Sequence, residues 1–276
     1  MMGMRAEIVE YMGRCGTSGK IPNFWMSPWY LENSGWVPIQ EDGAIGWVES
    51  EGSQRLMLPM LSPSGAASGK PWADFPLPSP VLDVLDRQYV YSPSQINSWT
   101  GGANRGRRKA LGVALRALSN PSLSAFCLSW GSIPSIQESA AESILREWSA
   151  EKGDGVYDPE MMVQALLVPP ENSMAKVGQL YLGDTLLALV MIDLGPIPGD
   201  GAWWNFRYCL PLNIPGVAEL ARFFVWDYLA QVFSGPHNRP IFINDGGDLD
   251  RPGLAQFKQK LNPLLVLYTP TNNKME

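Results

Sequence analysis

The order of apolar segments in the second half of the chain limits the possible folds more than any other feature. Two apolar runs, at 177–182 and 185–194, flank the two-residue turn Gly183-Asp184, and this pattern predicts a β-hairpin. A strand followed by a helix and a parallel strand implies a mixed sheet with helices packed on it, not a sandwich or a bundle. The sequence therefore predicts an α/β fold of the mixed α+β kind. The remaining strands are expected at 202–210, 240–244 and 264–269, and the helices at about 217–233 and 252–261.

The first half carries shorter signals of the same type. Apolar runs within residues 36–61, interrupted by Glu41-Asp42-Gly43, predict a β-meander, so the N-terminal third is expected to be mainly strand. Residues 62–80 are rich in Ser, Gly, Ala and Pro, which favours a connecting loop. Helices are expected at about 103–118 and 136–151 and from Asp158-Pro159 onward, with a short strand at 125–130.

Composition fixes the broad class of protein. The 276 residues are 45% hydrophobic and 17% charged, which allows one large or two small domains with a buried core and excludes intrinsic disorder. No stretch reaches the ~18 consecutive apolar residues of a membrane span, and the start carries Arg5, Glu7 and Glu10. The net charge of −6 would be repelled by anionic bilayers. We therefore expect a cytoplasmic protein without a membrane partner.

Cysteine and histidine are scarce, which narrows the possible chemistry. Cys15, Cys127 and Cys209 are far apart and odd in number, so they predict neither a disulfide framework nor a structural zinc site. The single histidine, His237, lies in a segment typical of a surface loop. The expected chemistry is therefore independent of metals and of histidine, and depends on carboxylates, tyrosines and backbone amides.

Basic residues are concentrated in one window of the chain. Between Asp86 and Glu138 no acidic residue occurs. Four of the cations lie where a helix is expected to begin, after Gly101-Gly102, although positive charge there opposes the helix dipole. Phosphate binding would explain the cluster, and so would a solvated basic face. The phosphate could belong to a nucleotide cofactor, a tRNA acceptor end or another nucleic acid. The six cations of the window are Arg87, Arg105, Arg107, Arg108, Lys109 and Arg116.

A second candidate site is the turn between the strand at 202–210 and the following helix. Here Gly216 and Ala218 would let a pyrophosphate approach the backbone N–H groups of the helix N-terminus, next to Asn213. An ordinary strand-to-helix turn explains the same residues equally well.

The third candidate site is the polar run that follows the strand at 240–244. We expect this strand to end at Asn244 and to open into a Gly-rich loop at the carboxyl edge of the sheet, where open α/β sheets bind ligands. Carboxylates there could orient an amine or act as bases, and the following lysines could hold a phosphate or a carboxylate. A loop of turn-forming residues is the simpler alternative. The residues concerned are Asp245, Asp248, Asp250, Lys258 and Lys260.

Short motifs along nearly the whole chain add a further indication. They are Asn23-Phe24-Trp25-Met26-Ser27-Pro28-Trp29-Tyr30, Glu41-Asp42-Gly43, Leu58-Pro59-Met60-Leu61-Ser62-Pro63, Tyr89-Val90-Tyr91, Trp99-Thr100-Gly101-Gly102, Arg105-Gly106-Arg107-Arg108-Lys109, Ile243-Asn244, Asp248-Leu249, Gly253-Leu254, Lys258 and Asn262-Pro263. In this order and spacing they resemble the C-terminal domain of phosphatidylglycerol lysyltransferases and their soluble relatives. The chain departs from that pattern near Lys109, at Asp245-Gly246-Gly247 and at Asn213.

The resemblance implies two tandem GNAT-like acyltransferase lobes, at 1–135 and 136–276. It implies an enzyme that transfers an acyl or aminoacyl group from a phosphate-bearing carrier, acyl-CoA or aminoacyl-tRNA, to an amine or hydroxyl acceptor. Backbone N–H groups of the strand at 202–210 would hold the oxyanion. We assign acceptor orientation to Asn244, Asp245 and Asp248, proton donation to Tyr208, donor contact to Asn213, Gly216 and Ala218, and phosphate binding to Arg105, Arg107, Arg108 and Lys109 with Lys258 assisting.

Two other functions fit the same sequence. The protein could transfer an acyl or amino-acid group to an amine of a nucleic-acid base, with the acid-free window as a docking surface whose affinity falls steeply with salt. Alternatively, the altered donor loop could have lost its cofactor, which would leave a non-catalytic binding protein.

Overall fold

The structure is a computed structural model of the chain. It describes residues 27, 29, 36–41, 44–49, 55–56, 87–93, 102–134, 137–152, 159–167, 175–195, 202–233, 241–248 and 251–267. The chain forms two compact units, each assembled from separate segments. Unit 1 comprises Met1–Ser92, Leu194–Asn205 and Arg239–Glu276, and unit 2 comprises Pro93–Asp193 and Phe206–Asn238. The two lobes that the resemblance implies, divided at residue 135, stay a prediction.

Unit 1 includes a small antiparallel sheet of order β1-β2-β3. Its register joins Glu41 to Ala44, so the turn falls where the sequence places it. This sheet confirms the predicted β-meander; the predicted loop at 62–80 lies outside the described residues. The strands are β1 (Trp36–Glu41), β2 (Ala44–Glu49) and β3 (Arg55–Leu56).

Among its described residues, unit 1 also contains three strands and one helix from distant parts of the chain. They are β4 (Gln88–Tyr91), β9 (Ile241–Gly247), β10 (Leu265–Leu267) and α7 (Pro252–Lys260). The strand β4 pairs antiparallel with both β9 and β10. The prediction that the strand ends at Asn244 is wrong, because Gly247 is still paired with Gln88 of β4. The expected Gly-rich loop is thus part of the sheet, and all four residues of β4 are buried.

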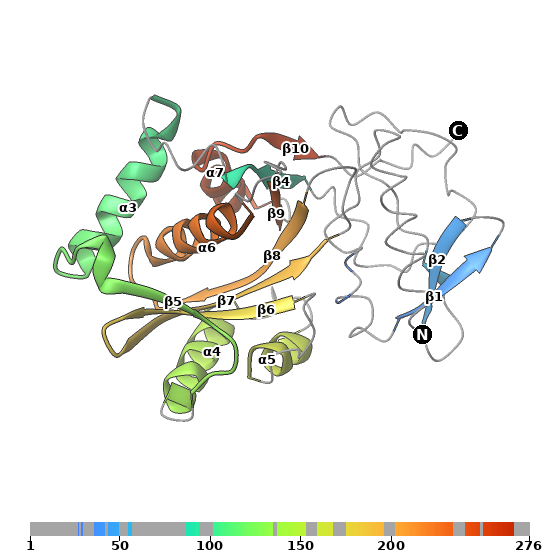
Figure 1. The fold of residues 1–276 in the computed structure, drawn as a ribbon, viewed down its shortest axis with the longest axis horizontal. Helices are drawn as coiled ribbons and strands as arrows, with labels where there is room; N and C mark the ends of the chain where they lie inside the picture. The colour runs from blue at the N-terminus through green and yellow to red at the C-terminus, as the bar shows by residue number, and fades with distance from the viewer. Residues whose placement is uncertain are drawn as a thin grey trace. The chain divides into compact units, whose positions relative to one another are not determined.

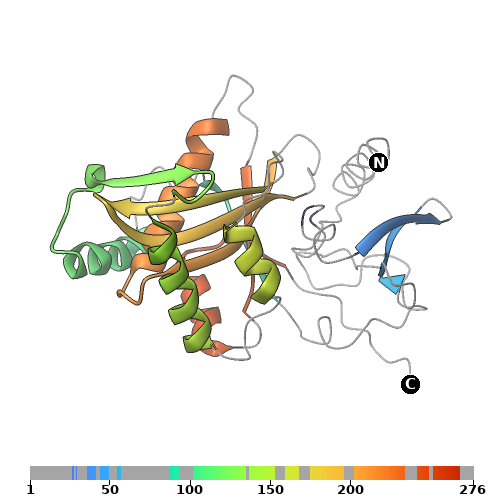
Figure 2. The ribbon, with the colours of Figure 1, turned by 90° about the horizontal axis from the view of Figure 1, so that it is seen from below.

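Unit 2 places helices on both faces of the antiparallel strands β5, β6 and β7. The helices α3 and α6 lie on one face and α4 and α5 on the other (Figure 1), and Figure 2 shows the second face from below. In the tight turn between β6 and β7, Gly183 has a positive φ of 58°, as such hairpins require. The predicted helices and strands are confirmed as α3 (Arg105–Ala117), β5 (Phe126–Trp130), α4 (Glu138–Lys152), α5 (Pro159–Leu167), β6 (Ala175–Leu182), β7 (Thr185–Leu194) and α6 (Val217–Phe233). Two short 3-10 turns, η3 (Gly102–Asn104) and η4 (Leu123–Ala125), were not predicted as separate elements.

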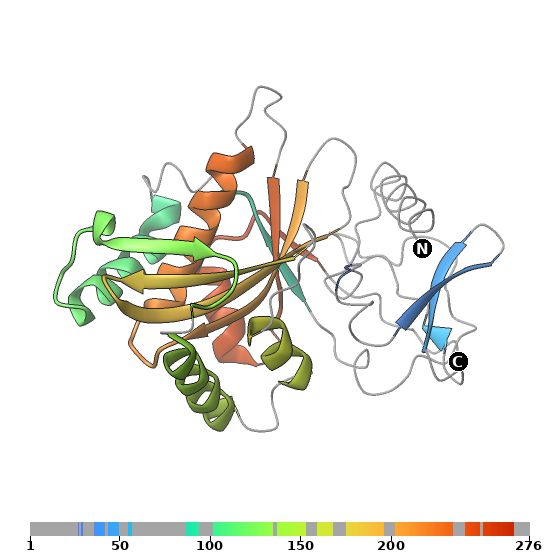
Figure 3. The ribbon, with the colours of Figure 1, turned by 60° about the horizontal axis from the view of Figure 1, so that its bottom comes forward.

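The strand β8 (Ala202–Pro211) runs through both units. Among the described residues the large sheet has seven strands in the order β10-β4-β9-β8-β7-β6-β5 (Figure 3). Its parallel pair β8–β9 is connected by α6, which confirms the predicted strand–helix–parallel strand unit. Register pairs between β8 and β9 end at Asn205 and Asn244.

The sequence explains why these elements pack as they do. Eight consecutive residues of β7 are buried, which matches a strand covered by helices on both faces. The helix α6 buries Val217, Leu220, Val225 and Leu229 and carries Glu219 in its first turn, where a negative charge complements the helix dipole. None of the helices among the described residues has the length and apolar character that a membrane crossing requires.

Candidate functional site

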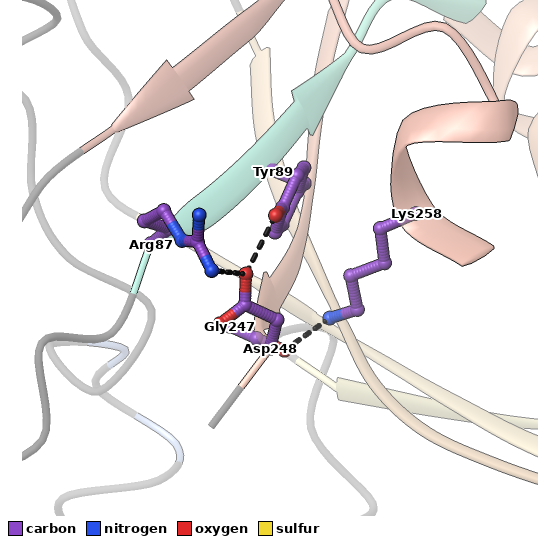
Figure 4. Close-up of polar contacts among 5 residues, drawn as sticks. All are labelled: Arg87, Tyr89, Gly247, Asp248 and Lys258. Atoms are coloured by element: carbon purple, nitrogen blue, oxygen red, sulfur yellow. Dashed lines mark hydrogen bonds and ion pairs between the residues drawn. The ribbon is translucent and has the colours of Figure 1, made fainter. Parts of the chain in front are cut away.

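A buried carboxylate is the centre of the site in unit 1. Asp248 follows the end of β9 and is wholly buried. Its Oδ2 accepts a hydrogen bond of 2.6 Å from the hydroxyl of Tyr89 and lies 3.0 Å from Nη2 of Arg87 (Figure 4). The side chain of Arg87 is 37% exposed. The carboxylate is therefore held by one buried donor from β4, Tyr89, and one half-exposed donor, Arg87, which directly precedes β4.

A buried lysine lies beside this carboxylate. Lys258 of α7 is 4% exposed, and its Nζ donates to the backbone carbonyls of Asp245 and Gly247, the latter at 2.7 Å (Figure 4). The Nζ also lies 5.8 Å from the ring centroid of Tyr89. The hydroxyl of Tyr91 donates to the backbone carbonyl of Lys258 at 2.9 Å, which ties α7 to β4. The predicted help of Lys258 in phosphate binding stays a prediction.

Two amides complete the polar cluster. Nδ2 of Asn244 donates to Oε1 of Gln88 at 2.8 Å, and Oδ1 of Asn244 accepts from the backbone N–H of Gly246 at 2.9 Å. Both side chains are buried. Asn244 is therefore held rigidly in β9, one strand from β4.

Charge within the cluster is balanced. It contains the buried acids Asp245 and Asp248 and the basic residues Arg87 and Lys258. An unpaired buried charge is costly, so such groups persist when opposite charges and hydrogen bonds accompany them. The structure brings together four residues that the sequence singled out, Asn244, Asp245, Asp248 and Lys258. Chemically, the arrangement can orient an amine or a hydroxyl group against a fixed carboxylate.

The contributions of β4 and of the preceding Arg87 to the site were not predicted. Arg87, Gln88 and Tyr89 supply the partners of Asp248 and Asn244, yet a strand of four residues with alternating aromatic side chains gives a weak signal. The signal that could have found it is the motif Tyr89-Val90-Tyr91, because a tyrosine hydroxyl that becomes buried needs a hydrogen-bond partner.

In unit 2, three of the predicted phosphate ligands on α3 are exposed and one is buried. Arg105, Arg108 and Lys109 are exposed on α3. Arg107 is 2% exposed, and its Cζ lies 5.5 Å from the ring centroid of Trp226 on α6. Its guanidinium therefore packs α3 against α6 through a cation–π contact.

The turn that leads into α6 has a structural role as well. Gly216 has a φ of 84°, and a Cβ there would lie 2.8 Å from the carbonyl oxygen of Ala110 and from the backbone nitrogen of Ala114. Glycine is therefore required at position 216 for the close approach of α3. This packing explains the glycine, so no bound ligand is needed to account for it. Asn213 is exposed, and the carbonyl of Ala218 accepts a 3.2 Å hydrogen bond from Arg222.

The other candidate residues are scattered. Tyr208 is half-buried on β8, Lys260 is exposed on α7, and Cys127 and Cys209 are free cysteines. Asp250, His237 and Cys15 lie outside the described residues. Within the part of the chain that the structure describes, no three His, Cys, Asp or Glu side chains gather as metal ligands.

A second buried ion pair lies in unit 2. Nη2 of Arg207 on β8 is 2.9 Å from Oδ2 of Asp193 on β7, and both side chains are almost completely buried. The spacing of the two residues in sequence gave no indication of this pair.

Comparisons with known proteins give structural matches only. No family model and no curated protein matches the chain. A conserved protein of unknown function from Bacteroides thetaiotaomicron VPI-5482 is 17% identical with a TM-score of 0.50, and the match covers 67% of this chain and 59% of that one. The C-terminal domain of a protein provisionally named lysylphosphatidylglycerol synthetase, from Agrobacterium fabrum, is 13% identical with a TM-score of 0.41, over 68% and 61%. The structure of L-PGS from Bacillus licheniformis is 14% identical with a TM-score of 0.42, over 68% and 62%.

This chain thus spans about three fifths of the length of each of these structures. The likeness to the Bacteroides protein shows a shared fold, and the mixed α+β class predicted from the sequence is confirmed.

Proposed function

We propose that the protein is an acyltransferase that moves an acyl or aminoacyl group from a phosphate-bearing carrier to an amine or hydroxyl acceptor. The observation that carries the proposal is the buried carboxylate of Asp248, fixed by Tyr89 and by the half-exposed Arg87. A carboxylate held in this way can orient the attacking group of an acceptor. The sequence motifs that resemble phosphatidylglycerol lysyltransferases support the same class of reaction.

The proposed reaction is a direct transfer. The acceptor nitrogen or oxygen attacks the carbonyl carbon of the carrier's thioester or ester, and the carbon–sulfur or carbon–oxygen bond then breaks. The proton lost by the acceptor balances the proton gained by the leaving group, for which Tyr208 is our candidate donor. Asn244, Asp245 and Asp248 orient the acceptor, and backbone N–H groups of β8 stabilise the oxyanion.

The proposed donor site is on unit 2. Arg105, Arg108 and Lys109 are exposed together at the start of α3, and a window without acidic residues surrounds them in sequence. This favours a ligand with several negative charges, such as the phosphates of acyl-CoA or aminoacyl-tRNA. The burial of Arg107 against Trp226 changes its expected role from phosphate ligand to anchor of the helix. Asn213, Gly216 and Ala218 remain in the proposal as donor contacts.

Thermal denaturation with carriers tests the donor. We compare acetyl-CoA, coenzyme A, aminoacyl-tRNA and uncharged tRNA over a range of concentrations. A carrier at 100 times its Kd stabilises the folded protein by about 2.7 kcal/mol. We expect saturable stabilisation by one acylated carrier and a weaker effect of its deacylated form. If none of the four raises the unfolding temperature, the protein has no such donor site and the proposal is wrong.

A further inference from the structure

One face of β8 in unit 1 holds two buried polar side chains that have no hydrogen-bond partner. Trp203 is 2% exposed with an unpaired Nε1, and Asn205 is fully buried with both Nδ2 and Oδ1 unpaired. Residues two apart in a strand point to the same face. This face therefore presents three N–H donors and one carbonyl acceptor, and none of these groups carries a charge.

The neighbouring amides show how unusual this is. Asn244 is the register partner of Asn205 on β9, and it uses both ends of its amide, toward Gln88 and Gly246. The large majority of buried polar side-chain atoms in folded proteins are paired. A row of three buried amides crosses β4, β9 and β8, and the member at the β8 end, Asn205, is the one without partners.

The indole of Trp203 is fixed next to this amide. Its ring centroid lies 5.8 Å from that of Phe242, and its backbone carbonyl accepts a hydrogen bond of 2.9 Å from Gly195. The indole also covers Gly195 so closely that a Cβ there would overlap with it. Trp203 therefore cannot rotate to find a partner elsewhere without disturbing these contacts.

We propose that Trp203 and Asn205 form a subsite for a neutral amide group of a ligand. An amide offers a carbonyl to the N–H donors and an N–H to Oδ1 of Asn205, so it satisfies both kinds of group. A carboxylate has no donor for Oδ1, and it would bring an unpaired charge into a buried place. An ammonium ion could donate only to Oδ1 of Asn205, and it has no acceptor for the three N–H donors.

This subsite is independent of the proposed transfer reaction. An amide-bearing part of either substrate could occupy it, but its occupancy can be measured without turnover. A protein that binds amides and transfers no acyl group would contradict the proposed function only. A transferase that binds no amide would contradict the subsite only.

The test is an NMR titration of the ¹⁵N-labelled protein that follows the indole N–H signals. The indole N–H signal of Trp203 is assigned because it is absent from the spectrum of Trp203→Phe. The probes are N-acetylglycinamide, sodium acetate and methylammonium chloride. We expect a saturable shift of the Trp203 signal with the amide only. Trp130 provides an internal control, because its buried Nε1 is also unpaired but lies on β5 in unit 2, and its signal should not move.

Matched variants separate the subsite from general effects on packing. Asn205→Leu removes the amide at similar volume, so we expect amide affinity to fall more than tenfold without a decrease in Tm. Gln179→Met removes another buried amide, whose Nε2 donates to the Gly131 carbonyl at 2.7 Å, and it should lower Tm but leave amide affinity unchanged.

Three results would overturn the proposal. They are the absence of a saturable amide shift in the wild-type protein, an equal response to all three probes, and unchanged affinity in Asn205→Leu. The first two depend on the wild-type protein alone, so the proposal remains falsifiable if the variant does not fold.

Discussion

Two ion pairs among the described residues have the same chemistry and different surroundings. Arg87 and Asp248 in unit 1 are 3.0 Å apart, and Arg207 and Asp193 in unit 2 are 2.9 Å apart. The side chain of Arg207 is 1% exposed, whereas that of Arg87 is 37% exposed. The Arg207–Asp193 pair is thus withdrawn from water on both sides, whereas the side chain of Arg87 is partly exposed to solvent, from which a ligand can approach it. Because the two distances are nearly equal, exposure is what distinguishes these two pairs.

Breaking the buried pair should have the largest effect. Arg207→Met removes the guanidinium that lies 2.9 Å from the carboxylate of Asp193, and the loss of one member of a buried pair costs about 3–5 kcal/mol. We expect urea denaturation to show this decrease in the free energy of unfolding. The double variant Asp193→Leu with Arg207→Met should recover much of it. A single variant as stable as the wild type would show that the two pairs do not differ as described.

Removing the tyrosine hydroxyl at the other pair should act on the reaction. Tyr89→Phe deletes the 2.6 Å hydrogen bond to Asp248, and hydrogen bonds to charged groups contribute about 1.5–3 kcal/mol. We expect kcat to fall about tenfold with the KM for the donor unchanged. Tyr91→Phe is the matched control on the same strand, because its hydroxyl donates to the neutral carbonyl of Lys258 at 2.9 Å. Equal kcat values in the two variants would contradict a positioning role for Tyr89.

The basic face of α3 should set donor affinity. Replacing Arg105, Arg108 and Lys109 together by Gln removes three exposed cations, so the Kd for the donor should rise at least tenfold and its dependence on salt should weaken. Arg116→Gln, near the end of the same helix, is the matched control and should change the Kd by less than about twofold. An unaltered Kd in the triple variant, measured by calorimetry, would remove α3 from the donor site.

Tyr181 should give the smallest effect, and only at high pH. Burial, with a smaller contribution from Cys127, raises the pKa of Tyr181 above its usual value. The folded protein then binds more protons than the unfolded chain at alkaline pH. The protonated hydroxyl of Tyr181 makes its full contribution to stability below the usual tyrosine pKa. This contribution is lost as the pH rises through that value toward the raised pKa of Tyr181. Between pH 8 and pH 11 the free energy of unfolding, measured by denaturation, should decrease less for Tyr181→Phe than for the wild type. An equal decrease would contradict this assignment.

Regular elements could be predicted from the sequence because their patterns are local. The helix α6 begins and ends where its apolar periodicity does, and the turn at Gly183-Asp184 identifies its hairpin. The strand β4 was missed because four residues cannot establish a period. The extension of β9 to Gly247 was missed because it depends on the pairing with β4, more than 150 positions away in sequence, across an irregularity in register where Gly246 has a φ of 65°.

The candidate site could be predicted only in part for the same reason. Asp248 and Asn244 were chosen from their place after a strand, but their partners come from β4. Among the cations of α3, nothing in the neighbouring sequence distinguishes Arg107 from Arg108. Arg107 is the buried one because it lies opposite Trp226 of α6.

The decisive experiment compares the transfer rate of Asp248→Asn with that of the wild type, because we propose that Asp248 orients the acceptor. Each protein is incubated with the carrier that stabilises it and with a panel of primary amines, and release of the deacylated carrier is followed. We expect the wild type and the control variant Asp227→Asn on α6 to release the deacylated carrier at the same amine-dependent rate, and Asp248→Asn to release it at least 100-fold more slowly. Equal rates in Asp248→Asn and the wild type would contradict the proposed role of Asp248.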